Sequence, residues 1–178
     1  MTDANSETTA MIYDDVGNLL SFTDELGHTT SYTYDALNRQ ITQTTPLGFT
    51  ASFTYDDANN LISVTDANNN TTTYGYDSLN RQTTTTNALG DISRVTYDIV
   101  GNVIASIDQL GRTVNYQYDN LNRQTQITDP NGNTIRYEYD AKGNVIAIRD
   151  GNGNTTTYEF DKIDLIKRSM GKVQRAKE

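Results

Sequence analysis

Three loops of the sequence carry oxygen-bearing side chains at the spacing that opens a calcium loop. They read Asp-Ala-Asn-Asn-Asn at 66–70, Asp-Pro-Asn-Gly-Asn at 129–133 and Asp-Gly-Asn-Gly-Asn at 150–154. An EF-hand loop also needs Gly at its sixth position and a bidentate Glu at its twelfth, and none of the three has this pair. A type I turn that ends in a left-handed residue explains them better, so we predict turns and no metal.

Catalytic chemistry has one candidate, His28, which is the only histidine and follows Gly27. There is no cysteine and no second histidine to join it. Ser, Thr and Asp side chains without a neighbouring base do not make a nucleophile. A catalytic site is normally unique, whereas every polar cluster here recurs along the chain. We therefore predict that His28 is a surface turn residue and that the chain is not an enzyme and has no cofactor.

Two further rows of side chains could bind a ligand. Arg39, Arg81 and Arg123 recur every 42 residues. We expect them to pair with nearby turn aspartates, which is worth about 0–1 kcal/mol for each exposed pair. A row of tyrosines could bind carbohydrate, but a hydrophobic face is the commoner role of an aromatic stripe.

All of these residues are spaced by a 21-residue repeat. Seven Tyr-Asp pairs and one Phe-Asp pair occur at this interval without any insertion. A second period of 42 is superimposed, because units continue alternately as Asp-x-x-Gly/Asn-Asn and as Asp-x-Leu-Asn-Arg-Gln. The repeated pairs are Tyr13 and Asp14, Tyr34 and Asp35, Tyr55 and Asp56, Tyr76 and Asp77, Tyr97 and Asp98, Tyr118 and Asp119, Tyr139 and Asp140, and Phe160 and Asp161.

Each unit contains two positions that predict a sharp turn, four and fourteen residues after the Tyr. They hold almost only Gly and Asn, the residues that tolerate a left-handed backbone. The Asp after each Tyr opens its turn, where its carboxylate can accept a backbone N–H. The predicted turn residues are Gly17, Gly27, Asn38, Gly48, Asn59, Asn69, Asn80, Gly90, Gly101, Gly111, Asn122, Gly132, Gly143 and Gly153.

The segments between the turns predict strands of about six residues. An aromatic or apolar residue two before each Tyr lies on the same strand face as that Tyr, as in Tyr32 and Tyr34. Thr, Ser, Gln and Arg occupy the other face. The fold class is therefore all-β, an antiparallel hairpin strip with about two strands per unit, curled or spiral. A parallel solenoid is less favourable because it would stack the repeated aspartates about 4.8 Å apart.

Composition agrees with a repetitive β-protein. Hydrophobic residues make up 35% of the chain and the net charge is −9, which argues against nucleic acid as a partner. No apolar run is long enough for a membrane span. The first ten residues have no basic and apolar parts of a secretory signal.

Three regions are expected. Residues 1–12 are a polar lead-in, and residues 13–161 are eight repeats. Residues 162–178 are a basic tail with a charge of +4. Apolar residues at roughly helical spacing predict a short helix or a frayed end for that tail.

The units Tyr-Asp-x-x-Gly-Asn and Tyr-Asp-x-Leu-Asn-Arg, with Thr-Asp-Pro-Asn-Gly-Asn-Thr at 128–134, resemble the RHS/YD repeat family over residues 13–161. The resemblance implies long antiparallel strips that spiral into a hollow shell. In bacterial toxins of this family the shell encloses a toxic domain, and animal relatives are cell-surface adhesion proteins. A secreted or surface location is implied, with other RHS/YD repeats or further copies of the chain as partners. The chain departs from the family in having too few repeats to close a large shell, and in showing no self-cleaving core segment.

Three functions follow as hypotheses. The leading one is a non-catalytic wall segment of a toxin-enclosing shell. The second is a self-assembling filament, because a strip has two unpaired strand edges. The third is an adhesion module that binds carbohydrate or protein through its tyrosines or arginines.

Overall fold

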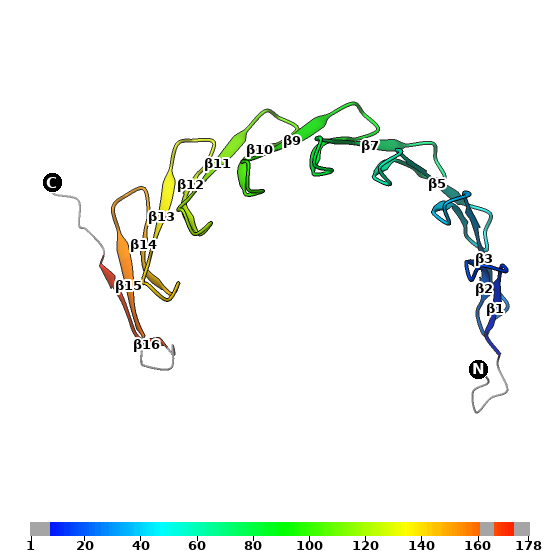
Figure 1. Cartoon of the computed structure of the whole chain (residues 1–178), viewed down its shortest axis with the longest axis horizontal. Helices are drawn as coiled ribbons and strands as arrows, with labels where there is room; N and C mark the ends of the chain where they lie inside the picture. The colour runs from blue at the N-terminus through cyan, green and yellow to red at the C-terminus, as the bar shows by residue number, and fades with distance from the viewer. Residues whose placement is uncertain (1–7, 161–165, 173–178) are drawn as a thin grey trace. The chain divides into compact units, whose positions relative to one another are not determined.

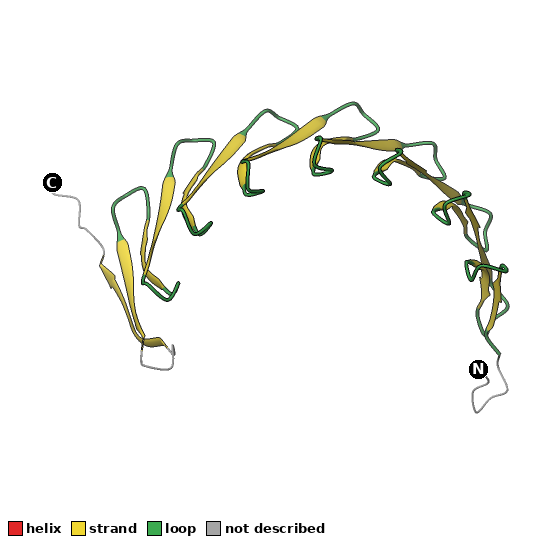
Figure 2. Ribbon diagram, in the orientation of Figure 1, coloured by secondary structure: helices red, strands yellow, loops and turns green. Residues whose placement is uncertain are grey.

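The computed structural model describes residues 8–160 and 166–172, and every regular element among them is a β-strand (Figure 2). No helix there is long and apolar enough to cross a membrane. The chain divides into two compact units at residues 92 and 93. Strands of the first unit are β1 (Ala10–Tyr13), β2 (Leu19–Thr23), β3 (Thr29–Tyr34), β4 (Gln40–Thr44), β5 (Thr50–Tyr55), β6 (Leu61–Thr65), β7 (Thr71–Tyr76) and β8 (Gln82–Thr86). Those of the second are β9 (Ile92–Tyr97, which starts at the boundary), β10 (Val103–Ile107), β11 (Thr113–Tyr118), β12 (Gln124–Thr128), β13 (Thr134–Tyr139), β14 (Val145–Arg149), β15 (Thr155–Phe160) and β16 (Ile166–Lys172).

Within each unit the strands follow one another in chain order and every neighbouring pair is antiparallel (Figure 1). Repeated residues therefore lie two strands apart and do not stack on adjacent strands. The prediction of an antiparallel hairpin strip is confirmed, and the parallel solenoid is wrong for this chain.

Two kinds of strand pair alternate. Where a strand ending in the repeated Tyr meets the next strand, the register shifts at that Tyr, as between Thr33 and Tyr34 in the pairing of β3 with β4. The following pair, β4 with β5, has three residue pairs and no shift. A shift of this kind is a bulge, which increases the local twist of the strand.

The turns are three-residue hairpin loops. In the loop after β3, Asn38 N–H donates to the carbonyl of Asp35 at 3.0 Å, and Asp35 N–H donates to the carbonyl of Arg39 at 2.9 Å. Asn38 has φ 61°, the left-handed conformation that closes such a loop. All fourteen turn residues predicted from the sequence have positive φ, five asparagines and nine glycines.

The two faces of the strip differ in chemistry. One carries cross-strand hydroxyl pairs, such as Thr33 with Thr42 at 2.6 Å and Thr54 with Ser63 at 2.6 Å. Alternation along the strand places Tyr32 and Tyr34 on the opposite face.

Neither face of the sheet is covered by other parts of the same compact unit. Among residues 8–160, Ala147 is the one buried hydrophobic residue and no polar residue is buried. The sheet is therefore a single layer whose cohesion comes from contacts within the sheet.

The basic tail differs from the expectation of a helix. Residues 166–172 form β16, which pairs with β15 through six residue pairs from Thr155 opposite Lys172 to Phe160 opposite Ile166. Most helical stability in proteins comes from packing of an apolar face, whereas the edge of β15 supplies a ready hydrogen-bonding ladder. Residues 161–165 and 173–178 lie outside the described residues. At the other end β1 starts at Ala10, inside the expected lead-in. The remaining region boundaries stay predictions.

The left-handed turn positions can be tested at Asn69, whose φ is 65°. We expect Asn69→Ala to lower the free energy of unfolding by about 1 kcal/mol, because a Cβ without local hydrogen bonding is disfavoured there. The matched variant Asn69→Gly should change it by less than about 0.5 kcal/mol. Urea unfolding of the three proteins measures this, and an equal loss in both variants would contradict the assignment.

Candidate functional site

The turns that follow the repeated Tyr carry the most extensive polar network among the described residues. We call these seven loops the YD turns and the seven alternating loops the second turns. The YD turns span residues 14–18, 35–39, 56–60, 77–81, 98–102, 119–123 and 140–144, and the second turns span residues 24–28, 45–49, 66–70, 87–91, 108–112, 129–133 and 150–154.

An aspartate organises each YD turn. Asp35 Oδ1 accepts hydrogen bonds from the N–H groups of Leu37 at 2.9 Å and Arg39 at 3.0 Å, and its Oδ2 accepts from Arg39 Nε at 2.7 Å. Asp56 does the same with the N–H groups of Ala58 and Asn60 and with the side-chain amide of Asn60. One carboxylate thus satisfies two backbone donors and one side-chain donor of its own turn.

Hydrogen bonding lowers the pKa of the aspartates in both kinds of turn. For Asp35 the backbone N–H of Arg39 contributes most, and for Asp66 the side-chain amide of Asn70 contributes most. In Asp98 desolvation raises the pKa and is the largest single effect, but the hydrogen bonds together outweigh it. The pKa is lowered in Asp14, Asp24, Asp35, Asp56, Asp66, Asp77, Asp98, Asp108, Asp119, Asp129, Asp140 and Asp150.

One second turn keeps the network although Asn and Asp have exchanged positions in it. Asn87 replaces the aspartate, and its carbonyl oxygen accepts from the N–H groups of Leu89 and Asp91. Its side-chain amide donates to Asp91 Oδ2 at 2.9 Å. In this turn an asparagine supplies the acceptor for the two backbone N–H groups, and the side chain of the residue that ends the turn accepts rather than donates.

The loops with calcium-like spacing use their oxygens in the same way. Asp66 accepts from the N–H groups of Asn68 and Asn70 and from the Asn70 side chain, all within 2.8–2.9 Å. His28 is an exposed turn residue, with its Nδ1 3.0 Å from Asp24 Oδ2. These contacts account for both sets of candidates as turn structure.

Neighbouring YD turns are joined by the side chain five residues after the Tyr. Asn18 Nδ2 donates to Asn38 Oδ1 of the next YD turn at 2.9 Å. Equivalent bonds join Asn60 to Asn80 at 2.9 Å and Asn102 to Asn122 at 3.0 Å.

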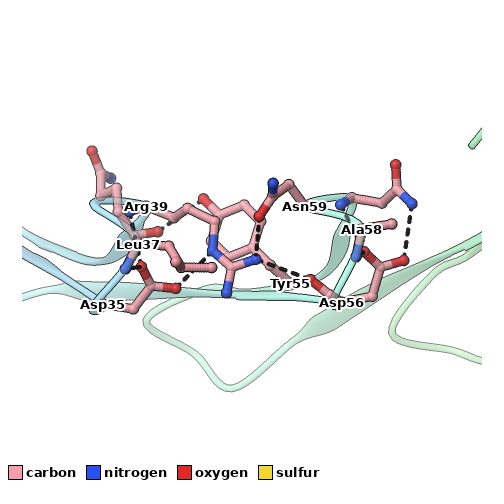
Figure 3. A network of polar contacts seen from close by, with 9 residues as sticks. Asp35, Leu37, Arg39, Tyr55, Asp56, Ala58 and Asn59 are labelled. Carbon is pink, nitrogen blue, oxygen red and sulfur yellow. Dashed lines mark hydrogen bonds and ion pairs between the residues drawn. The ribbon is translucent and has the colours of Figure 1, made fainter.

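Arg39 makes a stronger version of this link (Figure 3). Besides its ion pair with Asp35, its Nη1 donates to the carbonyl of Asp56 and to Asn59 Oδ1, both at 2.9 Å. Its guanidinium carbon lies 4.8 Å from the centre of the Tyr55 ring, a cation–π distance. Its side chain is 22% exposed, so the charge is largely removed from water.

The other two arginines of the row also pair with the aspartate of their own turn. Arg123 is 2.7 Å from Asp119, donates to the carbonyl of Asp140 at 3.0 Å and lies 4.6 Å from the Tyr139 ring centre. Arg81 is 2.7 Å from Asp77.

The repeated Tyr also joins strands through its hydroxyl. Tyr34 OH donates to the carbonyl of Leu19 at 2.9 Å, beyond the last residue pair between β2 and β3. It thus bonds where the two strands have separated. The same bond joins Tyr55 to Gln40, Tyr76 to Leu61, Tyr118 to Val103 and Tyr139 to Gln124.

Comparison with known families identifies the repeat. The RHS repeat family matches residues 13–50, 55–92, 97–134, 125–155 and 139–166. These segments cover most of the chain. The chain belongs to the RHS repeat family.

One solved structure of a Tc toxin complex shares the fold, and a second aligns less well. A Tc holotoxin pore of Photorhabdus luminescens with a mutation in TccC3 aligns with a TM-score of 0.52 and 14% identity over 97% of this chain. A TcdB2–TccC3 structure without its hypervariable C-terminal region aligns with a TM-score of 0.39 and 16% identity over 89%. This chain spans 13% and 12% of the lengths of those chains. None of the curated proteins matches it in sequence.

Sequence reasoning missed the links between RHS units, although a signal was present. The position five after each repeated Tyr alternates strictly between Asn and Arg from residue 18 to residue 144. Both side chains are hydrogen-bond donors long enough to reach the next turn.

A second feature was also missed: apolar side chains occupy many turn tips and are at least 61% exposed. They are Val16, Leu37, Leu79, Val100 and Leu121 in YD turns, and Leu26, Leu47, Leu89 and Leu110 in second turns.

The Arg link can be tested against an arginine that pairs only within its own turn. Arg39→Ala should lower the free energy of unfolding by about 2 kcal/mol, because it removes hydrogen bonds made by a largely desolvated charge. Arg112, 63% exposed and paired with Asp108, is the control, and Arg112→Ala should cost less than about 1 kcal/mol. Equal losses in chemical denaturation would contradict a link between units.

Stability should fall in acid. A folded-state pKa below the ordinary value of 3.8 contributes stability above that pH, and the contribution is lost as pH falls through the folded pKa. Protonation of all carboxylates also leaves the positive charge of 14 Lys and Arg without compensation. We expect the thermal midpoint to hold from about pH 7 to pH 5 and to fall steeply below about pH 4. A midpoint independent of pH down to about pH 2.5 would refute the role of the carboxylates.

Proposed function

We propose that this chain is a passive, non-catalytic segment of a β-sheet wall in a secreted or cell-surface RHS protein. The observation that carries this proposal is the single uncovered layer built from one repeated unit. Its described polar clusters recur with the repeat, and the turn carboxylates are satisfied by their own turns. A site for turnover would need a unique arrangement of groups held ready for a substrate.

A single layer with two different faces suits a wall. The hydroxyl face bonds within the sheet, and the aromatic face offers partly buried rings to whatever lies beside it. We infer that the aromatic face turns toward an enclosed space, because burial of aromatic surface is favourable and nothing within a unit covers it.

Other RHS repeats are the proposed partners of the two long edges of the strip, where the turns lie. Contiguous exposed apolar groups mark interaction sites when no part of the fold covers them. The exposed apolar turn tips recur along the edges at the period of the repeat, so another strip of the same period can meet them repeatedly.

Enclosure of a toxin is the finer part of the proposal. It is supported by family membership and by likeness of fold to a Tc holotoxin pore. This chain would supply one stretch of such a shell, with the remaining wall coming from further repeats.

The aromatic face separates this proposal from a carbohydrate-binding module. Tyr116→Ala should lower the free energy of unfolding by about 1–2 kcal/mol, because Tyr116 packs within the aromatic face. Gln117→Ala, on the hydroxyl face of the same strand β11, is the matched control and should change it by less than about 0.5 kcal/mol. Denaturation gives both values.

In parallel, a glycan array should show no saturable binding by the unmodified chain. Glycan binding lost in Tyr116→Ala and kept in Gln117→Ala would overturn the wall proposal, as would any catalytic turnover assigned to the chain.

A further inference from the structure

Among the described residues no strand pairs with the outer edge of β1, which carries exposed apolar side chains. It is a terminal strand of the sheet order, and Met11, Ile12 and Tyr13 are exposed by 54%, 59% and 52%. Unpaired N–H and C=O groups on such an edge are a template for another strand.

The sequence of this edge matches that of interior strands, which take a partner on the corresponding side. Residues 8–13, Thr-Thr-Ala-Met-Ile-Tyr, align with the repeat position of Thr-Thr-Ser-Tyr-Thr-Tyr in β3. There, β2 pairs along the edge with Thr23 opposite Thr29, Phe22 opposite Thr30 and Ser21 opposite Ser31. The same pairing recurs between β4 and β5 and between β6 and β7.

Tyr13 lacks the carbonyl that its counterparts bind. Tyr34 and Tyr139 donate to the carbonyl fifteen residues earlier, at 2.9 Å and 2.6 Å. The Tyr13 hydroxyl instead lies 3.2 Å from Met11 Sδ, a weak acceptor. An added strand in the interior register would bring a carbonyl to it.

The other terminal strand, β16, has the matching position in the repeat. It begins at Ile166, six residues after Phe160, as β2 begins at Leu19, six residues after Tyr13. It pairs with β15 on one side, and the sheet order ends with it. Interior repeats begin their second turn with Asp-x-x-Gly or a variant of it. The equivalent residues 171–174 read Gly-Lys-Val-Gln, and β16 continues to Lys172.

The two ends also carry opposite charge. Residues 1–15 hold four acidic residues and no Lys or Arg, whereas residues 162–178 hold six Lys or Arg and two acidic residues. Opposite charge steers association and disfavours pairing of like ends.

We propose that β16 of one copy pairs antiparallel with β1 of a second copy, in the register that β2 makes with β3. Met170 then lies opposite Thr8, Ser169 opposite Thr9 and Arg168 opposite Ala10, and the Tyr13 hydroxyl donates to the carbonyl of Ile166. The joint extends the strip from copy to copy. It goes beyond the proposed wall function, which would stand without it.

Cysteine cross-linking tests this register, because the chain contains no cysteine. Three interior equivalents of the pair formed by residues 8 and 170 are threonine pairs whose hydroxyl oxygens are 2.8 Å apart, Thr23 with Thr29, Thr44 with Thr50 and Thr65 with Thr71. Thr8→Cys and Met170→Cys proteins, mixed under mild oxidation, should therefore form a mixed disulfide dimer. Thr9→Cys mixed with Met170→Cys is the control, because residue 9 faces the other side of the strand, and it should cross-link at least about tenfold less. Equal cross-linking, or none in either mixture, would overturn the proposal.

Mass in solution gives an independent readout. Light scattering of the unmodified chain should show mass rising above 19.8 kDa with concentration. Hydrogen-bonded residues alternate along an antiparallel pair. The Asp24 N–H donates to the carbonyl of His28, so the N–H groups of Thr30 and Tyr32 in β3 point toward β2. The residues at the same repeat positions near β1 are Thr9 and Met11. Met11→Pro should block the joint and leave a monomer with an unchanged circular dichroism spectrum.

A charge reversal completes the test. Arg168→Glu should weaken the association more than Arg94→Glu, which makes the same change in net charge on the interior strand β9. A monomer at every concentration of the unmodified chain, or assembly unaffected by Met11→Pro, would refute the joint.

Discussion

The hydrogen bonds of the turn aspartates are the interaction on which the rest of this structure depends. A sheet with almost no buried residue cannot rely on a core to set its register, and a one-residue slip would exchange its two faces. In hairpins, the turn type and loop length fix the register. Each aspartate, such as Asp35, holds a three-residue loop in one conformation, and a left-handed Asn or Gly closes it. The repeat is therefore a series of locally defined hairpins that need little from outside the sheet.

The 42-residue period has a physical meaning at the YD turns. Asn18 and Asn60 reach only the side chain of the next turn, whereas Arg39 reaches its backbone carbonyl, its Asn side chain and its Tyr ring. Links of two strengths therefore alternate within each compact unit. Duplication of units in pairs would preserve this alternation, since each kind of link is built by residues of two successive units.

Most of the fold could be predicted from the sequence because each 21-residue repeat determines its own local structure. Gly17 and Asn38 were sufficient to place turns, since few other residues adopt positive φ, and the spacing of two between Tyr32 and Tyr34 defined a face. The link from Arg39 to Asp56 was not predicted, because it depends on the distance between successive turns, which strand pairing sets. Residues 166–172 were misjudged for the same reason. Their apolar spacing suits a short helix, but the free edge of β15 makes them a strand.

Amide hydrogen exchange measured by NMR tests most directly whether the turns hold the strip together. The N–H groups that donate to turn aspartates belong to residues such as Leu37, Arg39, Ala58 and Asn60. Near neutral pH they should exchange as slowly as the amides of the adjoining strands, because they open only when the hairpin opens. Exchange of these amides at the rates of unstructured loops, with the strands still protected, would contradict the account and place the stability in the strands alone.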